Sequence, residues 1–188
     1  MCGIAGWVDY DSRAREASAT AAKMARALVP RGPDAGGEWA DDNACLVHRR
    51  LIVVDPEGGV QPMASPDGDI ILIYNGELYN TEDLRAPLLA KGHVFRGHSD
   101  TEVLLHAFLE WGVDAFEKLN GIYAFAIWEQ RERRLTLCRD RLGVKPLFYS
   151  RTPNGVVFGS ELKALLCHPF VRPVLGEDGL RTLLLLGP

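Results

Sequence analysis

The sequence predicts an α+β domain in which antiparallel strands are layered against helices. Three observations support this class. Short apolar runs recur between turn residues, two pairs of these runs form plausible hairpins, and several separate segments carry apolar residues at helical spacing. The chain has 188 residues, of which 47% are hydrophobic and 24% charged, so it can bury one sizeable core. We therefore expect a single domain.

The first expected elements are a strand and a helix. Residues 3–9 are apolar and bounded by polar residues, which predicts a short buried strand. Within residues 12–29, Met24 and Leu28 share one face with neighbouring alanines, which predicts a helix that Pro30 ends.

The next part of the chain alternates between apolar runs and glycine-rich segments. Residues 31–39 and 56–63 are rich in glycine and proline and are predicted to be loops. Two short apolar runs lie between them, at residues 44–48 and 50–55, separated by charge. Residues 69–80 predict a buried strand that runs into a turn.

Two helices are predicted in the middle of the chain. Thr81 is expected to cap the first helix, and Pro87 in its interior should kink or shorten it. The second helix is predicted at residues 101–112, with Ser99 or Asp100 as its cap.

The remaining part of the chain predicts two hairpins and one more helix. Residues 121–129 and 133–140 form the first expected hairpin, and residues 146–160 form the second, which turns at residues 153–155. Residues 177–188 begin like a helix and then stop.

Composition excludes several classes of protein. The net charge of −4 gives no reason to expect binding to nucleic acid or to an anionic membrane. No apolar run approaches the roughly 20 residues of a membrane helix, and the N-terminus lacks a signal-peptide pattern. The four cysteines lack CxxC spacing and the five histidines form no ligand motif, so we expect neither disulfides nor a metal site. This cysteine usage suits the reducing cytoplasm, which is the expected location.

Cys2 is the first candidate for catalysis. Removal of Met1 would leave Cys2 with both its thiol and a free α-amine. An α-amine has a pKa of about 7.7–8.0, so it can act as a base near neutral pH and generate a nucleophilic thiolate. The competing interpretation is a small buried residue at the start of a strand, and Cys2 alone favours that interpretation.

Asn75 and Gly76 could form an oxyanion hole for attack on an amide. Asn75 offers a side-chain amide, and Gly76 offers a backbone N–H with no Cβ in the way. Each such donor typically contributes roughly 10²–10³ in rate. Asn-Gly is also a strong hairpin-turn signal, and alone it favours the turn.

Charged residues occur where binding of a free amino acid would need them. Arg50 could bind a carboxylate with its guanidinium fork, and Glu77 and Asp100 could bind an ammonium group. For Asp100 the role of helix cap is a strong alternative. Arg49 is adjacent to Arg50, so in an extended segment at most one of the two faces a given site, and spacing does not choose between them.

Nine motifs occur in a characteristic order along the chain: MCGIAG, RGPDAGGEW, HRRLIVVD, GGVQPM, YNGELYN, SDTEVLLHAF, LNGIYAFAIWE, RDRLGVKPLFY and FGSELKAL. Together they resemble the class II glutamine amidotransferases, and most closely the glutaminase domain of glutamine-hydrolysing asparagine synthetases of the B type. The resemblance runs from Met1 to about Leu166. It implies the four-layer αββα fold of N-terminal-nucleophile hydrolases, with two stacked antiparallel sheets between helices.

The resemblance also implies roles for individual residues. Cys2 would be the nucleophile with its own α-amine as base, and Asn75 and Gly76 would form the oxyanion hole. The family's HxRL segment assigns the glutamine carboxylate to Arg50 and leaves Arg49 outside the site. The other implied residues are Leu51, Ile52, Val53, Val54, Glu77 and Asp100, which would bind glutamine, and Arg31, which would support the nucleophile.

The implied reaction is hydrolysis of the side-chain amide of L-glutamine to glutamate and ammonia through a Cys2 thioester. In the full-length enzyme the ammonia would serve ATP-dependent synthesis of asparagine from aspartate. The family's synthetase domain carries an SGGxDS loop that this chain lacks, so residues 1–188 are expected to be the glutaminase domain, ending where that domain begins. No cofactor is expected in this domain, since ATP and Mg belong to the synthetase domain. The full-length enzyme could be a homodimer.

Two departures and two alternatives accompany the resemblance. Pro30, before RGPD, and Pro87 differ from the residues usual in the family, and neither removes a catalytic group. The same glutaminase could serve another acceptor, as in amidotransferases that act on peptides or secondary metabolites. β-Lactam synthetases and macrolactam-forming cyclases share the architecture but tend to lose the nucleophile or the pocket. A chain that retains Met1 would be a non-catalytic module that binds glutamine or docks a partner.

Overall fold

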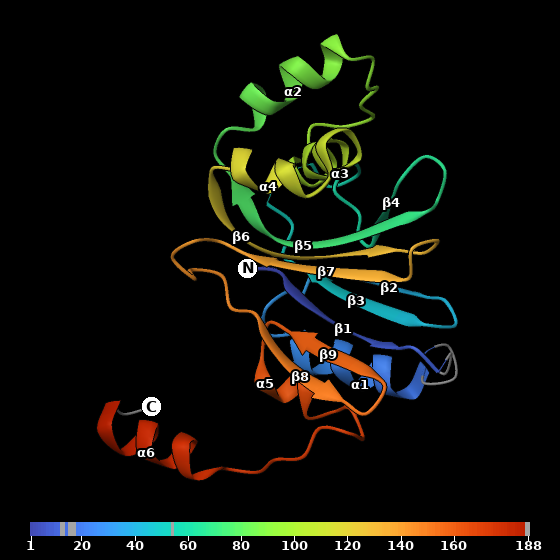
Figure 1. Cartoon of the computed structure of the whole chain (residues 1–188). Coiled ribbons are helices and arrows are strands. Elements are labelled where there is room, and N and C mark those ends of the chain that lie inside the picture. Colours follow the sequence, from blue (N-terminus) through green and yellow to red (C-terminus); the bar gives the residue numbers. More distant parts are fainter. Residues whose placement is uncertain (12–13, 15–17, 54, 187–188) are drawn as a thin grey trace.

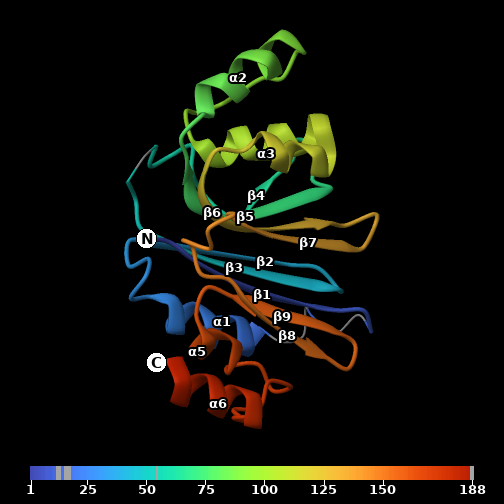
Figure 2. The same ribbon diagram turned by 60° about the vertical axis from the view of Figure 1, so that its left-hand side comes forward.

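The computed structural model describes residues 1–11, 14, 18–53 and 55–186. Two antiparallel sheets lie face to face, and helices cover both outer faces (Figure 1). The four layers remain distinct when the molecule is turned by 60° (Figure 2). The predicted αββα arrangement is therefore confirmed.

The strands form two sheets. Strands near the two ends of the chain form the first sheet, and strands in the middle of the chain form the second. The first sheet, in spatial order, contains β2 (Ala35–Ala40), β3 (Ala44–Arg50), β1 (Gly3–Asp9), β9 (Gly155–Gly159) and β8 (Phe148–Thr152). The second contains β4 (Met63–Ala64), β5 (Ile70–Leu78), β6 (Gly121–Glu129) and β7 (Arg134–Arg139). The predicted N-terminal strand and both predicted hairpins, β6–β7 and β8–β9, are confirmed.

The helices form the two outer layers. The first sheet is covered by α1 (Ser18–Leu28) and α5 (Leu162–Leu165), and the second by α2 (Thr81–Ala90), α3 (Asp100–Trp111) and α4 (Ala115–Lys118). A short 3₁₀ turn, Gly112–Asp114, joins α3 to α4. Past α5, the helix α6 (Glu177–Leu186) leaves Leu180, Leu184 and Leu185 exposed.

Side-chain alternation along the strands builds three apolar layers. Between the sheets lie residues such as Ile4, Leu46, Ile73 and Phe158, each fully buried. The alternate positions of the same strands, such as Ala5, Val47 and Leu72, face the helices, so each sheet is apolar on both faces. This explains why the strands are almost continuous hydrophobic runs in the sequence.

β1 lies in the middle of the first sheet, paired with β3 on one edge and β9 on the other. Gly6 permits this close approach, since a Cβ there would lie 2.4 Å from the carbonyl oxygen of Cys45 and 2.8 Å from the Phe158 ring. The start of the strand is anchored by Ser160, whose hydroxyl accepts a hydrogen bond from the Ile4 N–H at 3.1 Å. The residue before Gly3 is therefore held by an ordered strand.

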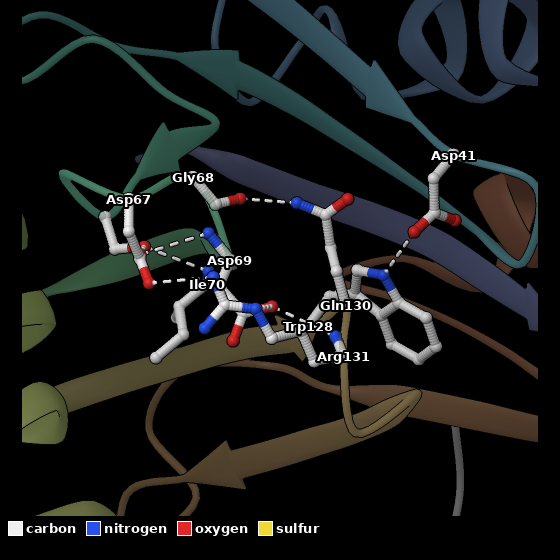
Figure 3. Close-up of polar contacts among 9 residues, drawn as sticks. Asp41, Asp67, Gly68, Asp69, Ile70, Trp128, Gln130 and Arg131 are labelled. Carbon is white, nitrogen blue, oxygen red and sulfur yellow. Dashed lines mark hydrogen bonds and ion pairs between the residues drawn. The ribbon is translucent and has the colours of Figure 1, made fainter.

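Polar contacts tie the turns together at one end of the sandwich. The indole N–H of Trp128 donates to Asp41 at 2.7 Å, which connects the two sheets, and Gln130 donates to the Gly68 carbonyl (Figure 3). Asn75 lies farther along β5, away from these turns.

Two local predictions were wrong. Residues 31–39 were expected to be a loop, but β2 occupies 35–40 and pairs with β3 as an edge strand, where glycine is tolerated because only one neighbour must be matched. Thr81 does not cap α2. The helix already includes Thr81, whose hydroxyl donates to the Leu78 carbonyl at 2.9 Å.

No helix among the described residues is long and apolar enough to cross a lipid bilayer.

Candidate active site

A cavity of about 450 Å³ lies at one end of the sandwich, beside the N-terminal residues Met1 and Cys2. Its lining includes most of the residues expected in the site: Cys2, Arg50, Leu51, Val53, Asn75, Gly76, Glu77 and Asp100. Arg31 and Ile52 are not in its lining, and Val54 lies outside the described residues. The N-terminus lies at this end of the sheets in both views (Figures 1 and 2).

Strand alternation brings three of these side chains into the space between the sheets. Cys2 is two residues before Ile4, and Asn75 is two residues after Ile73, whose side chains both face that space. Arg50 is likewise two residues after His48, which contacts the opposite sheet. The cavity is therefore an extension of the intersheet layer, lined by polar groups where the strands end.

Cys2 is half-buried at the cavity, and its thiol lies 3.7 Å from the carbonyl oxygen of Leu51. Arg31 holds the backbone of Cys2, because its Nε donates to the Cys2 carbonyl oxygen at 2.9 Å. Glu161 lies 3.7 Å from another nitrogen of the same guanidinium. Arg31 thus contacts the nucleophile candidate from outside the cavity.

Asn75 and Gly76 lie within β5, opposite Ala124 and Tyr123 of β6, so the turn interpretation is wrong. The Asn75 side chain is 1% exposed, and its Nδ2 has no hydrogen-bond partner among the described residues. An unpaired buried donor costs about 1–3 kcal/mol, and such a group needs an explanation. Gly76 cannot carry a side chain here, since a Cβ would lie 2.6 Å from the Ile122 carbonyl oxygen.

The two adjacent arginines point to opposite sides of β3. Arg50 is buried and lines the cavity, where its terminal nitrogens donate to the carbonyl oxygens of Asp55 and Pro56, both at 2.7 Å. Arg49 instead donates to the carbonyl oxygens of Gly32 at 3.0 Å and Pro33 at 3.2 Å. The geometry matches the expectation that only Arg50 faces the cavity.

Asp100 faces the cavity because Ser99 caps α3. The Ser99 hydroxyl accepts the Glu102 N–H at 3.3 Å, which leaves the Asp100 carboxylate to accept the Tyr74 hydroxyl at 2.8 Å and the Leu78 N–H at 3.2 Å. Burial raises the pKa of the Asp100 carboxyl above its usual value, although both hydrogen bonds oppose this. Burial and the neighbouring Asp100 also raise the pKa of Tyr74 well above its usual value.

Two further predicted residues lie at the rim. Glu77 lines the cavity with an exposed side chain. Ile52 lies outside it, and its N–H donates to the Asp34 carboxylate at 2.8 Å. Residues 51–53, which belong to the apolar run at residues 50–55, thus leave the sheet after Arg50 and do not form a strand.

Sequence reasoning missed Gln61, Tyr74 and Lys145, which also line the cavity. Gln61 is buried, accepts the Tyr74 N–H at 2.6 Å and donates to the Thr101 hydroxyl at 3.2 Å. For Tyr74, the only available sequence signal was that it directly precedes Asn75. Gln61 comes from the loop before β4 and Lys145 from the segment that joins β7 to β8, and only the fold reveals where these segments lie.

Within the described part of the chain, no three His, Cys, Asp or Glu side chains come together as a metal site.

The comparisons with known proteins identify a domain family. A family model for the glutamine amidotransferase domain matches residues 1–187. Asparagine synthetase [glutamine-hydrolyzing] 3 from Bacillus subtilis is 49% identical over 190 residues, and asparagine synthetase B from Escherichia coli is 36% identical over 167 residues. These alignments cover 100% and 88% of this chain but only 31% and 30% of the relatives. The chain thus spans about a third of their length.

A solved structure shares the fold. The glutamine phosphoribosylpyrophosphate amidotransferase from B. subtilis superimposes with a TM-score of 0.72 at 22% identity, covering 88% of this chain and 43% of that one. Such a likeness shows the fold alone.

Two stacked antiparallel sheets between helices define the class of fold, and a cysteine at the second position lines its cavity. The chain belongs to the glutamine amidotransferase domain family. Among its relatives are the glutamine-hydrolysing asparagine synthetases.

Proposed function

We propose that residues 1–188 form a glutaminase domain that hydrolyses the side-chain amide of L-glutamine. Once Met1 is removed, the α-amine of Cys2 accepts the thiol proton, and the thiolate attacks the amide carbon. The amine then returns a proton to the leaving nitrogen, so ammonia departs and a γ-glutamyl thioester remains. Water, deprotonated by the same amine, cleaves the thioester to glutamate and restores the thiol.

The charged residues of the cavity suit the two ends of a free amino acid. Arg50 would bind the α-carboxylate, while Glu77 and Asp100 would bind the α-ammonium group. The pocket then orients the side-chain amide toward Cys2, and Leu51 and Val53 line the path between. Arg31 acts through the Cys2 backbone as a positioning residue.

The observation that carries this proposal is the unpaired amide nitrogen of Asn75. It is buried, and the residue lines the same cavity as the Cys2 thiol. A donor held ready without a partner is what an oxyanion hole requires, because charge develops there only in the transition state. The backbone N–H of Gly76 would be the second donor.

The test compares the processed chain with a Cys2→Ala variant. Intact mass establishes that Met1 is absent, and glutamate formation from glutamine is then measured. We expect activity in the wild type and none above background in the variant. A processed wild type that forms no glutamate, or a variant that matches it, contradicts the proposal.

In the longer protein we propose that ammonia reaches a synthetase domain that follows residue 188 and makes asparagine from activated aspartate. The relatives named as asparagine synthetases support this acceptor. ATP and Mg would act in that domain, and this one would need neither. A cytoplasmic location and a homodimeric full-length enzyme belong to the same proposal, and nucleic acid and membranes are not expected partners.

Two alternatives give different results in the same experiments. A glutaminase serving another acceptor would hydrolyse glutamine but produce no asparagine when the full-length protein is supplied with aspartate and ATP. A chain that retains Met1 would bind glutamine without hydrolysing it, because its amine is acylated and cannot act as base.

A further inference from the structure

Lys145 places a buried ammonium group in the cavity beside the start of the chain. The residue is 8% exposed, lines the same cavity as Cys2, and has its Nζ 3.2 Å from the Sδ of Met1. No carboxylate pairs with this ammonium group within the part of the chain that the structure describes. Lysines are rarely buried without an acidic partner, since removing the charge from water costs free energy.

The backbone around Lys145 is held in place by a buried carboxylate. Asp140 accepts hydrogen bonds from the N–H groups of Lys145 at 2.9 Å, Val144 at 2.8 Å and Tyr123 at 3.3 Å. Burial raises the pKa of Asp140, but these donors outweigh burial and keep the pKa below its usual value. Arg139 adds a bond from its Nε to the Lys145 carbonyl oxygen at 2.6 Å.

This anchor connects Lys145 to the strand that carries the proposed oxyanion hole. Tyr123, which donates to Asp140, lies opposite Gly76 in the pairing of β6 with β5. The backbone of Lys145 is therefore held by the same strands that carry the site.

The other charged and titratable groups around Cys2 are of both signs. Those that line the cavity or contact Cys2 are Arg31, Arg50, Tyr74, Glu77, Glu82, His98, Asp100 and Glu161, the last through Arg31. The acidic residues Glu77 and Asp100 would favour a protonated amine at the N-terminus. A protonated amine cannot accept the proton of the thiol. A cation close to the amine opposes that effect.

We propose that the ammonium group of Lys145 keeps the α-amine of Cys2 neutral at neutral pH and stabilises the thiolate that the amine generates. Lys145 is a positioning residue, which acts on the base without taking or giving a proton. This inference rests on the proposed function, in which the α-amine accepts the proton from the Cys2 thiol. Removal of Met1 would leave the lysine without its thioether contact, in the same cavity as the new amino terminus.

The test uses Lys145→Met, which removes the charge and keeps the length, and Lys145→Arg, which restores the charge. Lys23→Met, on the exposed face of α1, is the matched control. For each processed chain, kcat/KM for glutamine is measured between about pH 5.5 and 9.5. The rate at which iodoacetamide alkylates Cys2, followed by peptide mass, gives a second profile that needs no turnover.

We expect the acidic limb of both pH profiles to shift to higher pH by about one unit in Lys145→Met. At about pH 6.5 the rate should fall roughly tenfold, while on the alkaline plateau it should change by less than about twofold. Lys145→Arg and Lys23→Met should follow the wild type.

Unshifted limbs in Lys145→Met overturn the inference. A higher KM at every pH without a shift also overturns it, because the cation would then bind substrate. If the processed wild type forms no glutamate, the proposed function fails, while the alkylation profiles still decide the role of Lys145.

Discussion

The imidazole of His48 and the carbonyl oxygen of Tyr74 join the two sheets directly behind the cavity, with 3.1 Å between Nε2 and the oxygen. His48 precedes Arg50 by two residues on β3, and Tyr74 precedes Asn75 on β5. The acceptor is a carbonyl, so Nε2 must carry the proton. Burial is the main reason that the pKa of His48 is lowered to about 4, and the ring is therefore neutral at neutral pH.

This contact predicts how stability responds to acid. Between about pH 6.5 and 4 the unfolded chain protonates His48 and the folded chain does not, so the free energy of unfolding falls as the pH is lowered. The contribution of His48 across this window is about 3 kcal/mol. Urea denaturation should show a smaller loss in a His48→Gln variant than in the wild type. Exposed His98→Gln is the control, and equal slopes in wild type and His48→Gln would contradict the prediction.

Asn75→Ala should lower kcat for glutamine by roughly 10²–10³ with little change in KM, because the lost donor acts on the oxyanion of the transition state. Steady-state kinetics on the processed chain measures this. The variant also removes an unpaired buried donor, so the free energy of unfolding should not decrease by much. Asn154→Ala, in the β8–β9 turn, is the control. A change confined to KM would assign Asn75 to substrate binding instead.

Tyr74→Phe should raise the KM for glutamine as the pH is lowered. Burial already raises the pKa of Asp100, and loss of the Tyr74 hydroxyl removes a hydrogen bond that opposes that rise. Asp100 would then become neutral at a higher pH, and a neutral acid no longer pairs with the substrate ammonium group. The pH below which KM rises should therefore be higher in Tyr74→Phe than in the wild type, while kcat stays near the wild-type value. Tyr149→Phe, at an exposed tyrosine, should leave the curve unchanged.

Gly6→Ala should destabilise the fold by about 2–3 kcal/mol, since the new Cβ would lie 2.4 Å from the Cys45 carbonyl oxygen. Gly176→Ala is the matched control because no atom lies within 4 Å of the added Cβ, and its effect should stay within about 0.5 kcal/mol. Urea denaturation of both variants measures the difference. Equal stability of the two would mean that β1 and β3 can separate at no cost.

Much of the fold was predictable because local patterns and tertiary contacts agree. β1 and the two hairpins have apolar runs with turn residues between them, and the structure contains them. β2 was missed because its glycines read as loop. Gly37 is needed for packing instead, since a Cβ there would lie 2.1 Å from the Gln61 carbonyl oxygen. Such an approach between distant segments leaves no periodic signal.

The site was predictable in part for a similar reason. Cys2, Arg50 and Asn75 carry distinctive functional groups and lie in recognisable sequence motifs, and the structure places all three at one cavity. Tyr74 reads as a core aromatic residue, and Gln61 as part of a loop. Their hydrogen bonds to Asp100 and Thr101 depend on how β5 packs beside α3, which single-sequence patterns do not encode.

The central position of β1 has a consequence for synthesis of the chain. Translation produces β1 first, yet one of its neighbours is β9, and the hydrogen bond between Ile4 and Ser160 spans 156 positions. Until the ribosome has released that later segment, the strand that follows Cys2 has a free edge and the end of the chain lacks its anchor. The order of translation thus leaves the amino terminus accessible to an aminopeptidase that could remove Met1 before β9 and Ser160 hold the start of β1 in place.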